Sequence, residues 1–407
     1  MIDIKDQKQC CGCSACVQKC PKHCISLKED NEGFLYPIVE KDYCIDCGLC
    51  EKVCPVLNQG EKRQPIKVYA AKNKNEEIRS QSSSGGFFTL LAEAIIKEGG
   101  VVFGARFDDN WEVRHDYAET IEGLDVFRGS KYLQSRVENS YQKTEVFLKQ
   151  GRKVLFSGTP CQIAGLKCFL GKEYENLFTV DIVCHGVPSP GVWRRYLKEQ
   201  IERINDKYSI PYEMSRIEEI SFRNKCTGWK NYSFATTITT TKEIGTKDSI
   251  TFCELSSKNA FMKGFLANLY LRPSCYDCPS KCGKSGSDMT IGDLWGATSI
   301  IGQDNDDKGI SLVLVNKNIS DLQSYPSLWL KEIDYSSAII HNPCIEKCVR
   351  KPQKRNCFYL CLQRVGNLDM VINKFTKVSL YDKTIMNTKR IVKRILRDNC
   401  YLTTKNK

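Results

Sequence analysis

The sequence predicts a small cysteine-rich α+β domain, then a larger α/β domain with a mixed sheet, and finally a helical basic C-terminal tail. Three observations predict this arrangement. A cysteine spacing repeats within the first 57 of 407 residues, strand and helix patterns alternate after about residue 66, and positive charge concentrates after residue 341. We expect the regions to be 1–60, 61–150, 151–341 and 342–407.

The composition is that of an ordinary folded protein, apart from its cysteines. Apolar residues make up 41% and charged residues 27%, which excludes wholesale disorder. No uncharged apolar run reaches the roughly 18 residues of a membrane helix, and the N-terminus lacks the pattern of a secretory signal. We therefore expect a cytoplasmic protein whose 23 cysteines stay reduced. With only four histidines, thiolate-bound iron–sulfur clusters, zinc or Cu(I) are the metal centres to consider.

Two cysteine runs share the spacing C-x2-C-x2-C-x3-C-P. This run is typical of bacterial two-cluster ferredoxins, in which three cysteines bind one [4Fe-4S] cluster and the fourth binds the other. The ligands predicted for the first cluster are Cys10, Cys13, Cys16 and Cys54. The ligands predicted for the second are Cys44, Cys47, Cys50 and Cys20. Two zinc sites are the alternative, although zinc motifs usually separate two CxxC pairs by a longer spacer. Cys11 and Cys24 fall outside the pattern and are interpreted as spare thiols.

Elements of the α/β domain can be predicted in order along the chain. A Ser/Gly-rich stretch at 82–86 precedes FFTLLAEAIIKEGG, an apolar run at helical spacing that ends in two glycines, as a helix C-cap would. VVFGARFDD, KVLFSGTPCQ and LFTVDIVCHG predict strands, and QIAGLKCFL predicts a helix. Residues 216–255, rich in β-branched and aromatic side chains, predict an antiparallel insertion. SDMTIGDLWG and ISLVLVN predict further strands.

Seven of these segments carry a family resemblance: RSQSSSGGFFTLLA, GSKYLQS, VLFSGTPCQIAGL, VDIVCHGVPSP, FRNKCTGW, RPSCYDC and SDMTIGDLWG. In order and content they resemble the family of beta subunits of coenzyme F420-reducing hydrogenase and formate dehydrogenase, over about residues 66–316. The resemblance implies FAD and one further [4Fe-4S] cluster. In that family the flavin exchanges a hydride with a two-electron carrier and single electrons with the cluster. Relatives include chlorophyll-pigment reductases, so the fold does not fix the substrate.

The expected ligands of the further cluster are Cys161, Cys184, Cys275 and Cys278. The first two each end a predicted strand, where the loops of α/β folds converge on ligands, and the last two form a CxxC between prolines. Cys282 is a competitor, because it could complete a three-cysteine zinc site with Cys275 and Cys278. Three other cysteines are interpreted as packing residues, Cys168, Cys226 and Cys253.

The flavin site is predicted without a GxGxxG fingerprint, which the chain lacks. The residues expected to present amides and hydroxyls to a pyrophosphate are Ser82, Ser83, Ser84, Gly85 and Gly86. An ordinary helix N-cap is the alternative. Lys131 and Arg223 are candidate positive groups near the flavin or an anionic substrate, with surface ion pairs as the alternative. Lys131 and His185 are the candidate catalytic residues, His185 as a proton donor unless it is a structural histidine.

The basic character lies wholly in the tail. Residues 342–407 hold 16 Lys and Arg against 4 Asp and Glu, whereas the preceding residues hold 44 of each sign. An amphipathic helix is predicted over 386–399. A solvated face is one interpretation of the charge, and docking to an acidic partner or an anionic membrane surface is the other. No nucleic-acid partner is expected.

These features favour a flavin-dependent iron–sulfur oxidoreductase. Electrons would pass between a one-electron carrier protein and the flavin through three clusters, and the flavin would exchange two electrons with a small substrate or coenzyme, such as coenzyme F420 or a biosynthetic intermediate. The alternative is a non-catalytic electron-relay subunit docked on a partner enzyme. A structural zinc protein is the third hypothesis.

Overall fold

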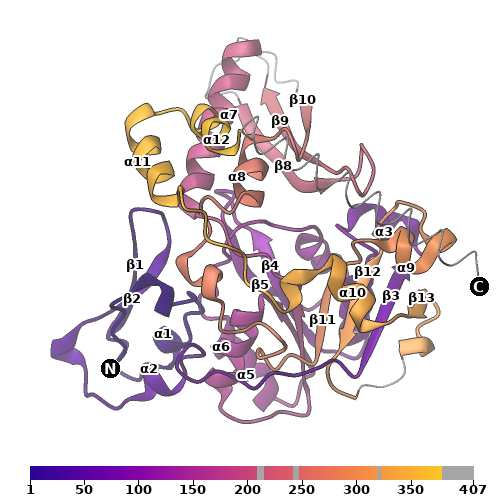
Figure 1. The fold of residues 1–407 in the computed structure, drawn as a ribbon. Helices are drawn as coiled ribbons and strands as arrows, with labels where there is room; N and C mark the ends of the chain where they lie inside the picture. The colour runs from indigo at the N-terminus through magenta and orange to yellow at the C-terminus, as the bar shows by residue number, and fades with distance from the viewer. Residues whose placement is uncertain (209–214, 242–246, 319–321, 378–407) are drawn as a thin grey trace, which may run out of the picture.

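The computed structural model describes residues 1–208, 215–241, 247–318 and 322–377. The helix expected over 386–399 lies outside the described residues. No helix in the described ranges is long and apolar enough to cross a membrane. Figure 1 shows three parts: a small N-terminal unit at one side, a central sheet domain, and a helical and β-stranded layer above the sheet.

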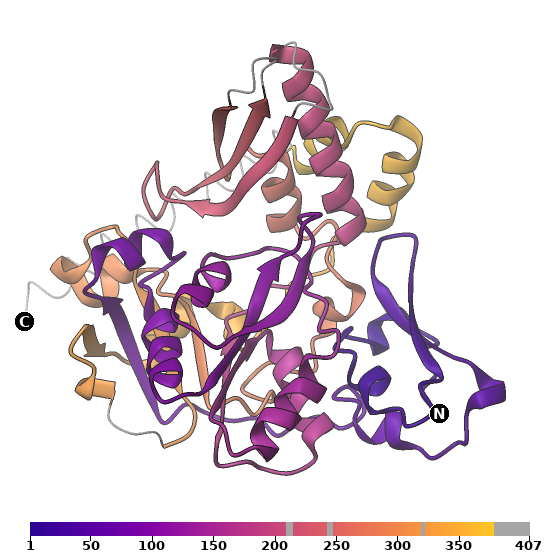
Figure 2. The ribbon, with the colours of Figure 1, turned by 180° about the vertical axis from the view of Figure 1, so that it is seen from behind.

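The N-terminal unit is an antiparallel hairpin with two short helices, and Figure 2 shows it beside the sheet domain. The hairpin strands are β1 (Ile25–Glu29) and β2 (Leu35–Val39), and the helices are α1 (Ala15–Lys19) and α2 (Leu49–Lys52). Its own buried core consists of two isoleucines and three cysteines, Ile2, Ile25, Cys20, Cys24 and Cys50. An apolar core of this size gives little stability by itself. A bound metal centre would therefore contribute to the folding free energy of this unit.

The sheet domain contains an eight-stranded mixed sheet in the order β13-β3-β12-β11-β7-β6-β4-β5. Its strands are β3 (Lys67–Asn73), β4 (Val101–Phe107), β5 (Val113–Ala118), β6 (Val154–Gly158), β7 (Leu177–Ile182), β11 (Met289–Asp293), β12 (Ser311–Val315) and β13 (Leu328–Glu332). The central four strands β4, β6, β7 and β11 are mutually parallel, and the outer strands pair antiparallel. The carboxyl ends of the parallel strands therefore meet at one edge, where α/β folds bind ligands.

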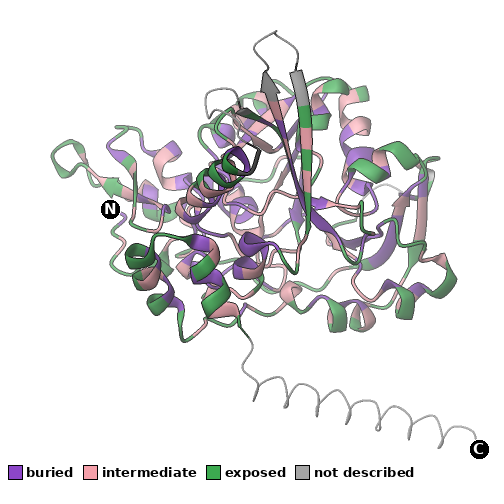
Figure 3. Cartoon of the chain, turned by 90° about the horizontal axis from the view of Figure 1, so that it is seen from above, coloured by how far each residue is buried: buried purple, intermediate pink, exposed green. Residues whose placement is uncertain are grey.

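Helices cover both faces of this sheet, because its strands alternate buried side chains between the two faces. Val102 and Leu155 face α4 (Phe87–Lys97), whereas Phe103 and Phe156 face α5 (Ser140–Lys149) and α6 (Pro160–Leu170). Three shorter helices are α3 (Glu76–Gln81), α9 (Ala297–Ile301) and α10 (Tyr335–His341). In Figure 3 the buried residues concentrate on the sheet and on the inner sides of the helices. The regions expected at 61–150 and 151–341 both contribute strands to this one sheet.

The layer above the sheet contains the antiparallel insertion that the sequence predicts. Its strands are β8 (Ser215–Asn224), β9 (Ser233–Thr241) and β10 (Lys247–Leu255), in the order β10-β9-β8. Its helices are α7 (Pro190–Tyr208), α8 (Ala260–Leu266), α11 (Arg355–Val365) and α12 (Leu368–Thr376). Short 3-10 helices occur elsewhere, η1 (Gln7–Gln9), η2 (Lys41–Tyr43), η3 (Glu122–Phe127), η5 (Pro273–Asp277), η6 (Gly302–Asp304), η7 (Leu322–Ser324) and η8 (Pro343–Ile345).

The first part of the expected basic tail belongs to this layer. The side chains of Phe358, Leu362 and Val371 are buried in the same core as α7 and α8. Residues 355–376 therefore form helices packed on the body and not a free extension, because their apolar faces complete that core. The basic helical tail expected over 342–407 is not confirmed as a whole, since 378–407 lie outside the described residues.

Trp193 on α7 is central to the core of the upper layer. Its side chain is 1% exposed, its ring lies 5.1 Å from that of Phe222 and 5.0 Å from that of Phe261, and its Nε1–H donates to the Trp111 carbonyl at 2.7 Å. We predict that Trp193→Ala lowers the free energy of unfolding by about 3–5 kcal/mol, because it leaves a cavity and an unpaired carbonyl. Denaturant unfolding followed by circular dichroism measures this. Leu360→Ala, at a 56% exposed position, is the control; equal losses in the two variants would contradict the packing described.

Candidate functional site

The two cysteine runs of the N-terminal unit fold toward each other. A small pocket is lined by all four cysteines predicted for the second cluster, Cys20, Cys44, Cys47 and Cys50. Cys47 is exposed, and the amide of Ile2 donates to Cys50 Sγ at 3.2 Å. Four converging thiols, one of which already accepts an amide hydrogen bond, are a donor set that fits a [4Fe-4S] cluster. The exposed Cys47 places this site at the surface.

The cysteines predicted for the first cluster are also neighbours. Burial raises the pKa of Cys16 to about 12, with further contributions from the nearby Cys10 and Cys54. Burial likewise raises the pKa of Cys54. The hydrogen bond with Cys11 lowers the pKa of Cys13, but burial and the nearby Cys16 and Cys10 sulfurs raise it overall. Thiols that resist ionisation in this way become ligands only where metal charge compensates the thiolates. The described residues contain no group of three or more His, Cys, Asp or Glu that could hold a single metal ion, and a four-iron cube spaces its thiolates more widely.

The four cysteines expected to hold a further cluster lie inside the body. They are Cys161, Cys184, Cys275 and Cys278, from the start of α6, the loop after β7, and η5 with its C-cap. Burial raises the pKa of Cys275 to about 12 and that of Cys278 to about 11, and Cys161 adds to both shifts. Burial also raises the pKa of Cys184, with Cys275, Cys161 and Cys278 adding to it. Four sulfurs that act on one another in a buried space fit a third [4Fe-4S] cluster.

Two cysteines outside this set form hydrogen bonds with the nearby backbone. The Cys282 thiol, the competitor for the CxxC, donates to the Glu346 carbonyl at 3.3 Å. Cys348 was not predicted, yet its Sγ accepts the amide of Cys278 at 3.1 Å. The C-x3-C spacing of Cys344 and Cys348 was the available signal, but it lies in the basic region that the sequence assigned to a tail.

The cysteines outside the three predicted ligand sets lie in different environments. Cys226 and Cys253 are exposed and are not packing residues, because Cys226 lies in the turn after β8 and Cys253 lies at an exposed position of β10. Cys168 lies on α6 and does pack against the core of the sheet domain. Cys11, which the sequence assigns as a spare thiol, has a buried side chain. It belongs to the same buried cluster as Cys13 and Cys161. The hydrogen bond with Cys13 raises the pKa of Cys11, whereas the hydrogen bond with Cys161 lowers it, and the net shift is upward. The Sγ atom of Cys24 lies 3.5 Å from the Sγ atom of Cys20.

A cleft of about 310 Å³ opens at the carboxyl ends of the parallel strands. Its lining includes four of the five predicted loop residues, Ser82, Ser83, Ser84 and Gly86, together with Lys131 and Trp295. The walls near the sheet include Phe88, Phe127 and Ile291. A large cleft with an apolar wall and a polar loop fits a flavin with its isoalloxazine and pyrophosphate parts.

The Ser/Gly loop is held in place by hydrogen bonds within the protein. Ser83 Oγ accepts the amide of Ser130 at 2.6 Å, and Ser84 Oγ donates to the Ile310 carbonyl at 2.6 Å. The amide of Gly85 donates to Ser311 Oγ at 3.0 Å, and a Cβ on Gly85 would lie 2.3 Å from the Ala71 carbonyl oxygen. Gly85 is therefore not the free phosphate donor that the sequence suggested, because its amide is used and the position is closely packed.

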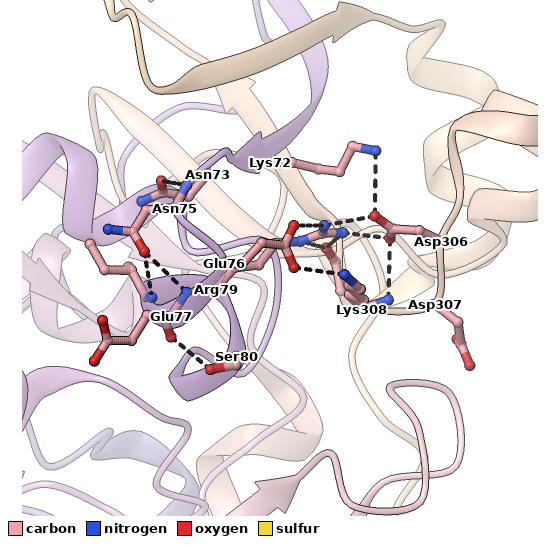
Figure 4. A network of polar contacts seen from close by, with 12 residues as sticks. Lys72, Asn73, Asn75, Glu76, Glu77, Arg79, Ser80, Asp306, Asp307 and Lys308 are labelled. Atoms are coloured by element: carbon pink, nitrogen blue, oxygen red, sulfur yellow. Dashed lines mark hydrogen bonds and ion pairs between the residues drawn. The ribbon is translucent and has the colours of Figure 1, made fainter.

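An ion-pair network anchors this loop from below (Figure 4). Arg79, 3% exposed, donates to both carboxylate oxygens of Asp306, at 2.7 and 2.6 Å, and to the Gly309 carbonyl. Burial alone would raise the pKa of Asp306, but the hydrogen bonds with Arg79 outweigh burial and lower the pKa to about 2. The Asp306 carboxylate is therefore ionised near neutral pH. Lys225 Nζ donates to the carbonyls of Arg79 and Ser84. The network fixes α3 and the loop before α4 to the strand end at β12.

Lys131 enters the cleft as an amine held by carbonyl groups. Its Nζ donates to the Arg128 carbonyl at 2.9 Å and to the Gly129 carbonyl at 3.2 Å. Burial lowers its pKa to about 7, and Arg106 adds to the shift. Lys131 is therefore suited to hold or release a proton near neutral pH, which the alternative of a surface ion pair would not allow.

Arg223 lies behind the wall of the cleft. Its guanidinium pairs with Asp293 and lies 4.2 Å from the ring of Tyr232 and 5.0 Å from that of Trp295. Asp293 and Trp295 line the cleft, but Arg223 does not. Arg223 thus supports the cleft through these two residues and is not placed to contact a ligand directly.

His185 also lies outside the cleft lining. Its Nε2 lies 2.7 Å from Asn268 Oδ1, and its ring contacts Phe265 at 5.1 Å, which matches the alternative of a structural histidine. His115, which sequence reasoning missed, does line the cleft and hydrogen-bonds the Ser157 carbonyl through Nε2 at 3.0 Å. Burial lowers its pKa to about 4, so it is neutral near pH 7. Nothing in its strand pattern marked it.

The cleft and the internal cysteines share a wall. Thr159 lines the cleft, and its Oγ1 lies 3.2 Å from Cys161 Sγ. Val183 also lines the cleft and directly precedes Cys184. The same strand ends thus present one residue to the cleft and the next residues to the cysteine group.

Comparison with known proteins decides the family. Residues 9–58 match the family described as 4Fe-4S dicluster domain. Residues 68–140 and 151–322 match the coenzyme F420 hydrogenase/dehydrogenase beta subunit, N-term and C terminus respectively. The chain belongs to this family of beta subunits and carries an N-terminal dicluster domain. The family resemblance and the N-terminal [4Fe-4S] prediction are confirmed, and the chain is an iron–sulfur electron-transfer protein of an oxidoreductase family.

Individual relatives match parts of the chain. An uncharacterized protein of Methanocaldococcus jannaschii is 27% identical over 257 residues, covering 55% of this chain and 71% of that protein. A subunit of the F(420)H(2) dehydrogenase of Methanosarcina mazei is 27% identical over 200 residues, covering 45% of this chain and 55% of that protein. Ferredoxin 7Fe of Hydrogenibacillus schlegelii is 46% identical over 65 residues, covering 15% of this chain and 77% of that protein.

One solved structure is also similar, the F420-reducing [NiFe] hydrogenase complex from Methanosarcina barkeri. Its matching chain is 17% identical, with 72% of this chain and 97% of that chain covered. The TM-score is 0.42, which is too low to support an argument about this protein.

The lowered pKa of Lys131 predicts a pH-dependent stability. Between about pH 7 and about pH 10.4, the unfolded chain keeps a proton on this lysine that the folded protein has released. The free energy of unfolding contributed by this group should therefore rise with pH across that window, and Lys131→Met should remove the rise. Unfolding midpoints at several pH values measure this. Lys198→Met, at a side chain 73% exposed, is the control, and identical pH slopes for both variants would contradict the burial of Lys131.

Proposed function

We propose that this protein is an FAD-dependent iron–sulfur oxidoreductase. It passes single electrons between an external carrier protein and a flavin site, and exchanges two electrons there with a small substrate or coenzyme. The observation that carries this proposal is the continuous series of three cysteine groups and one cleft. The series begins at the exposed Cys47, passes Cys13 and Cys161 around the buried Cys11, and ends where Thr159 lines the cleft.

The ligand sets of the proposal follow the three groups. The surface cluster is held by Cys20, Cys44, Cys47 and Cys50, the next by Cys10, Cys13, Cys16 and Cys54, and the internal one by Cys161, Cys184, Cys275 and Cys278. When bound, the clusters supply single-electron transfer and the flavin supplies the change from one- to two-electron chemistry. Burial of the two inner groups lowers the local dielectric and thereby strengthens the effect of each nearby charge on the clusters.

Residues of the cleft have separate roles in this proposal. The Ser83 hydroxyl, which among the described residues only accepts a hydrogen bond, and Gly86 lie on the pyrophosphate side, whereas Ser82 and Ser84 Oγ donate to the Ile78 and Ile310 carbonyls and hold the loop in place. The apolar wall with Phe88 and Ile291 excludes water from the ring. Lys131 is the residue that holds or donates a proton at Nζ, since its pKa is about 7. Arg223 positions Asp293 and Trp295 from behind.

The two-electron partner is a small molecule in this proposal, either a coenzyme such as F420 or a biosynthetic intermediate. The family name and the M. mazei relative, which by its name belongs to an F(420)H(2) dehydrogenase, support the coenzyme. The same names support the second candidate function, a relay subunit docked on a partner enzyme, because these relatives are subunits. Contact of the basic tail with an anionic membrane surface and a cytoplasmic location stay predictions.

The composition of the anaerobically purified protein tests the cofactors. Three four-iron clusters predict about twelve irons per chain, together with one FAD. Cys275→Ala should retain about eight irons, because it removes one ligand of the internal cluster only. Cys226→Ala, at an exposed cysteine outside all three groups, should keep the full content. Iron near eight in the unaltered protein would remove the internal cluster, and flavin absent with iron complete would leave the flavin proposal unsupported.

Rapid reduction by a one-electron donor tests the electron path. Reduced ferredoxin should bleach the bound flavin in the unaltered protein, and Cys161→Ala should slow this bleaching while the N-terminal clusters still become reduced. Stopped-flow absorbance follows both events. Equal flavin bleaching in Cys161→Ala would contradict the path.

Removal of residues 378–407 separates the enzyme from the docked relay. This deletion is preferable to one from residue 342, because α11 and α12 belong to the body. Unchanged turnover with a small acceptor would count against docking through the tail.

A further inference from the structure

Arg272 lies where the N-terminal unit meets the internal cysteines. Its side chain is 0% exposed. Its amide donates to the Val187 carbonyl at 2.9 Å, and its carbonyl accepts the amide of Cys275 at 2.9 Å. The backbone turn that positions Cys275 therefore also fixes the start of this side chain.

The guanidinium reaches out of the body into the N-terminal unit. Nε donates to the Cys10 carbonyl at 2.8 Å, and Nη2 donates to the Leu35 carbonyl at 2.9 Å and lies 3.5 Å from Cys10 Sγ. Nη1 donates to Gln134 Oε1 at 2.9 Å. The cation also lies 4.3 Å from the ring centre of Tyr36. One side chain thus binds the first cysteine run, the hairpin and the body together.

The neighbouring Gly12 leaves room for this arrangement. A Cβ at Gly12 would lie 2.8 Å from Arg272 Nη1 and 2.5 Å from Gln134 Nε2, and the residue has φ of +73°. Glycine is required here both for the left-handed backbone and for the close approach of the guanidinium. The cysteine loop is therefore shaped around Arg272.

The hydrogen-bond partners of Arg272 are carbonyl, amide and thiol groups, although a buried guanidinium is costly unless charge offsets it. Burial alone lowers its pKa, but Cys10, Tyr36, Cys11 and Cys275 together raise it. Cys10 and Cys275 belong to the ligand sets of two different clusters in the proposed function. With metal bound, both become thiolates, and the cation lies in the field of each.

We propose that Arg272 is a positioning residue that joins the cluster held by Cys10 to the cluster held by Cys275 and raises the reduction potential of both. This inference rests on the proposed function. In each transfer one electron arrives from the external one-electron carrier and no bond is made or broken. A cluster held by either cysteine would carry one more negative charge when reduced, and the fixed buried cation would stabilise that charge.

Substitutions of two buried arginines test this role. Arg272→Gln removes the charge, and Arg272→Lys keeps the charge but loses the planar fork of donors. The matched control is Arg355→Gln. Arg355 is 5% exposed and also links the body to the N-terminal unit, through Glu32 at 2.7 Å, yet its other partners are the Leu271 carbonyl and Tyr276 rather than cysteines.

The measurement is a redox titration of the full-length holoprotein followed by electron paramagnetic resonance, with iron content and proteolysis within 58–65 as structural readouts. Arg272→Gln should lower both reduction potentials by about 59 mV, which corresponds to a tenfold change in the one-electron equilibrium constant. Arg272→Lys should shift them less. Arg355→Gln should leave the potentials unchanged, even where it increases proteolysis as much as Arg272→Gln does.

Unchanged potentials in Arg272→Gln, or equal shifts in Arg355→Gln, would overturn the role of Arg272. If Arg272→Gln loses iron, Arg272→Lys decides: potentials lowered by about 59 mV or more despite the retained charge would overturn the role, and a smaller lowering would support it. An unaltered protein without an internal cluster would overturn the proposed function and this inference together. If the unaltered protein contains all three clusters and the flavin, but Arg272→Gln leaves the reduction potentials unchanged, only this inference would be overturned.

Discussion

Burial of cysteine sulfur is the constraint on which the rest of the structure depends. The N-terminal unit has a core in which cysteines outnumber aliphatic side chains, and the internal cysteines are enclosed between loops of the sheet domain. Burial raises the pKa of both Cys16 and Cys275 to about 12. These two thiols are therefore neutral without metal and become thiolates only beside a positively charged centre. The energetics of folding and of metal binding are therefore coupled most strongly in the first sixty residues.

The parallel centre of the sheet gives the second constraint. Strands β6 and β7 run side by side, so the loops that follow them emerge together at one edge. The residues just after β6 divide their side chains between the cleft and the cysteine group, as Thr159 and Cys161 do. Because both sets of residues follow the same strand ends, the ligand cleft and the cysteine group lie next to each other.

Sequence reasoning succeeded where a pattern is local. The repeat of cysteine spacing, the strands ending in GTPC and CHG, and the antiparallel insertion are set by neighbouring residues, and each is found in the structure. It failed where the environment comes from distant segments. Cys226 is exposed in the turn after β8 and Cys253 on β10, Gly85 is closed off by Ser311, and His185 is held by Asn268. Cys11 and Cys348, which the predicted ligand sets left out, lie against predicted ligands.

The sequence by itself determined the family, the dicluster domain and the grouping of cysteines within each short run, because a run of eleven residues can bend only in ways that its own glycines and prolines allow. Only the tertiary structure decided which groups lie next to one another. The neighbours Cys10, Cys161 and Arg272 are more than a hundred residues apart along the chain, and their meeting depends on sheet order and on how the N-terminal unit packs against α6. Such contacts follow from the summed burial of many side chains, which no local pattern encodes.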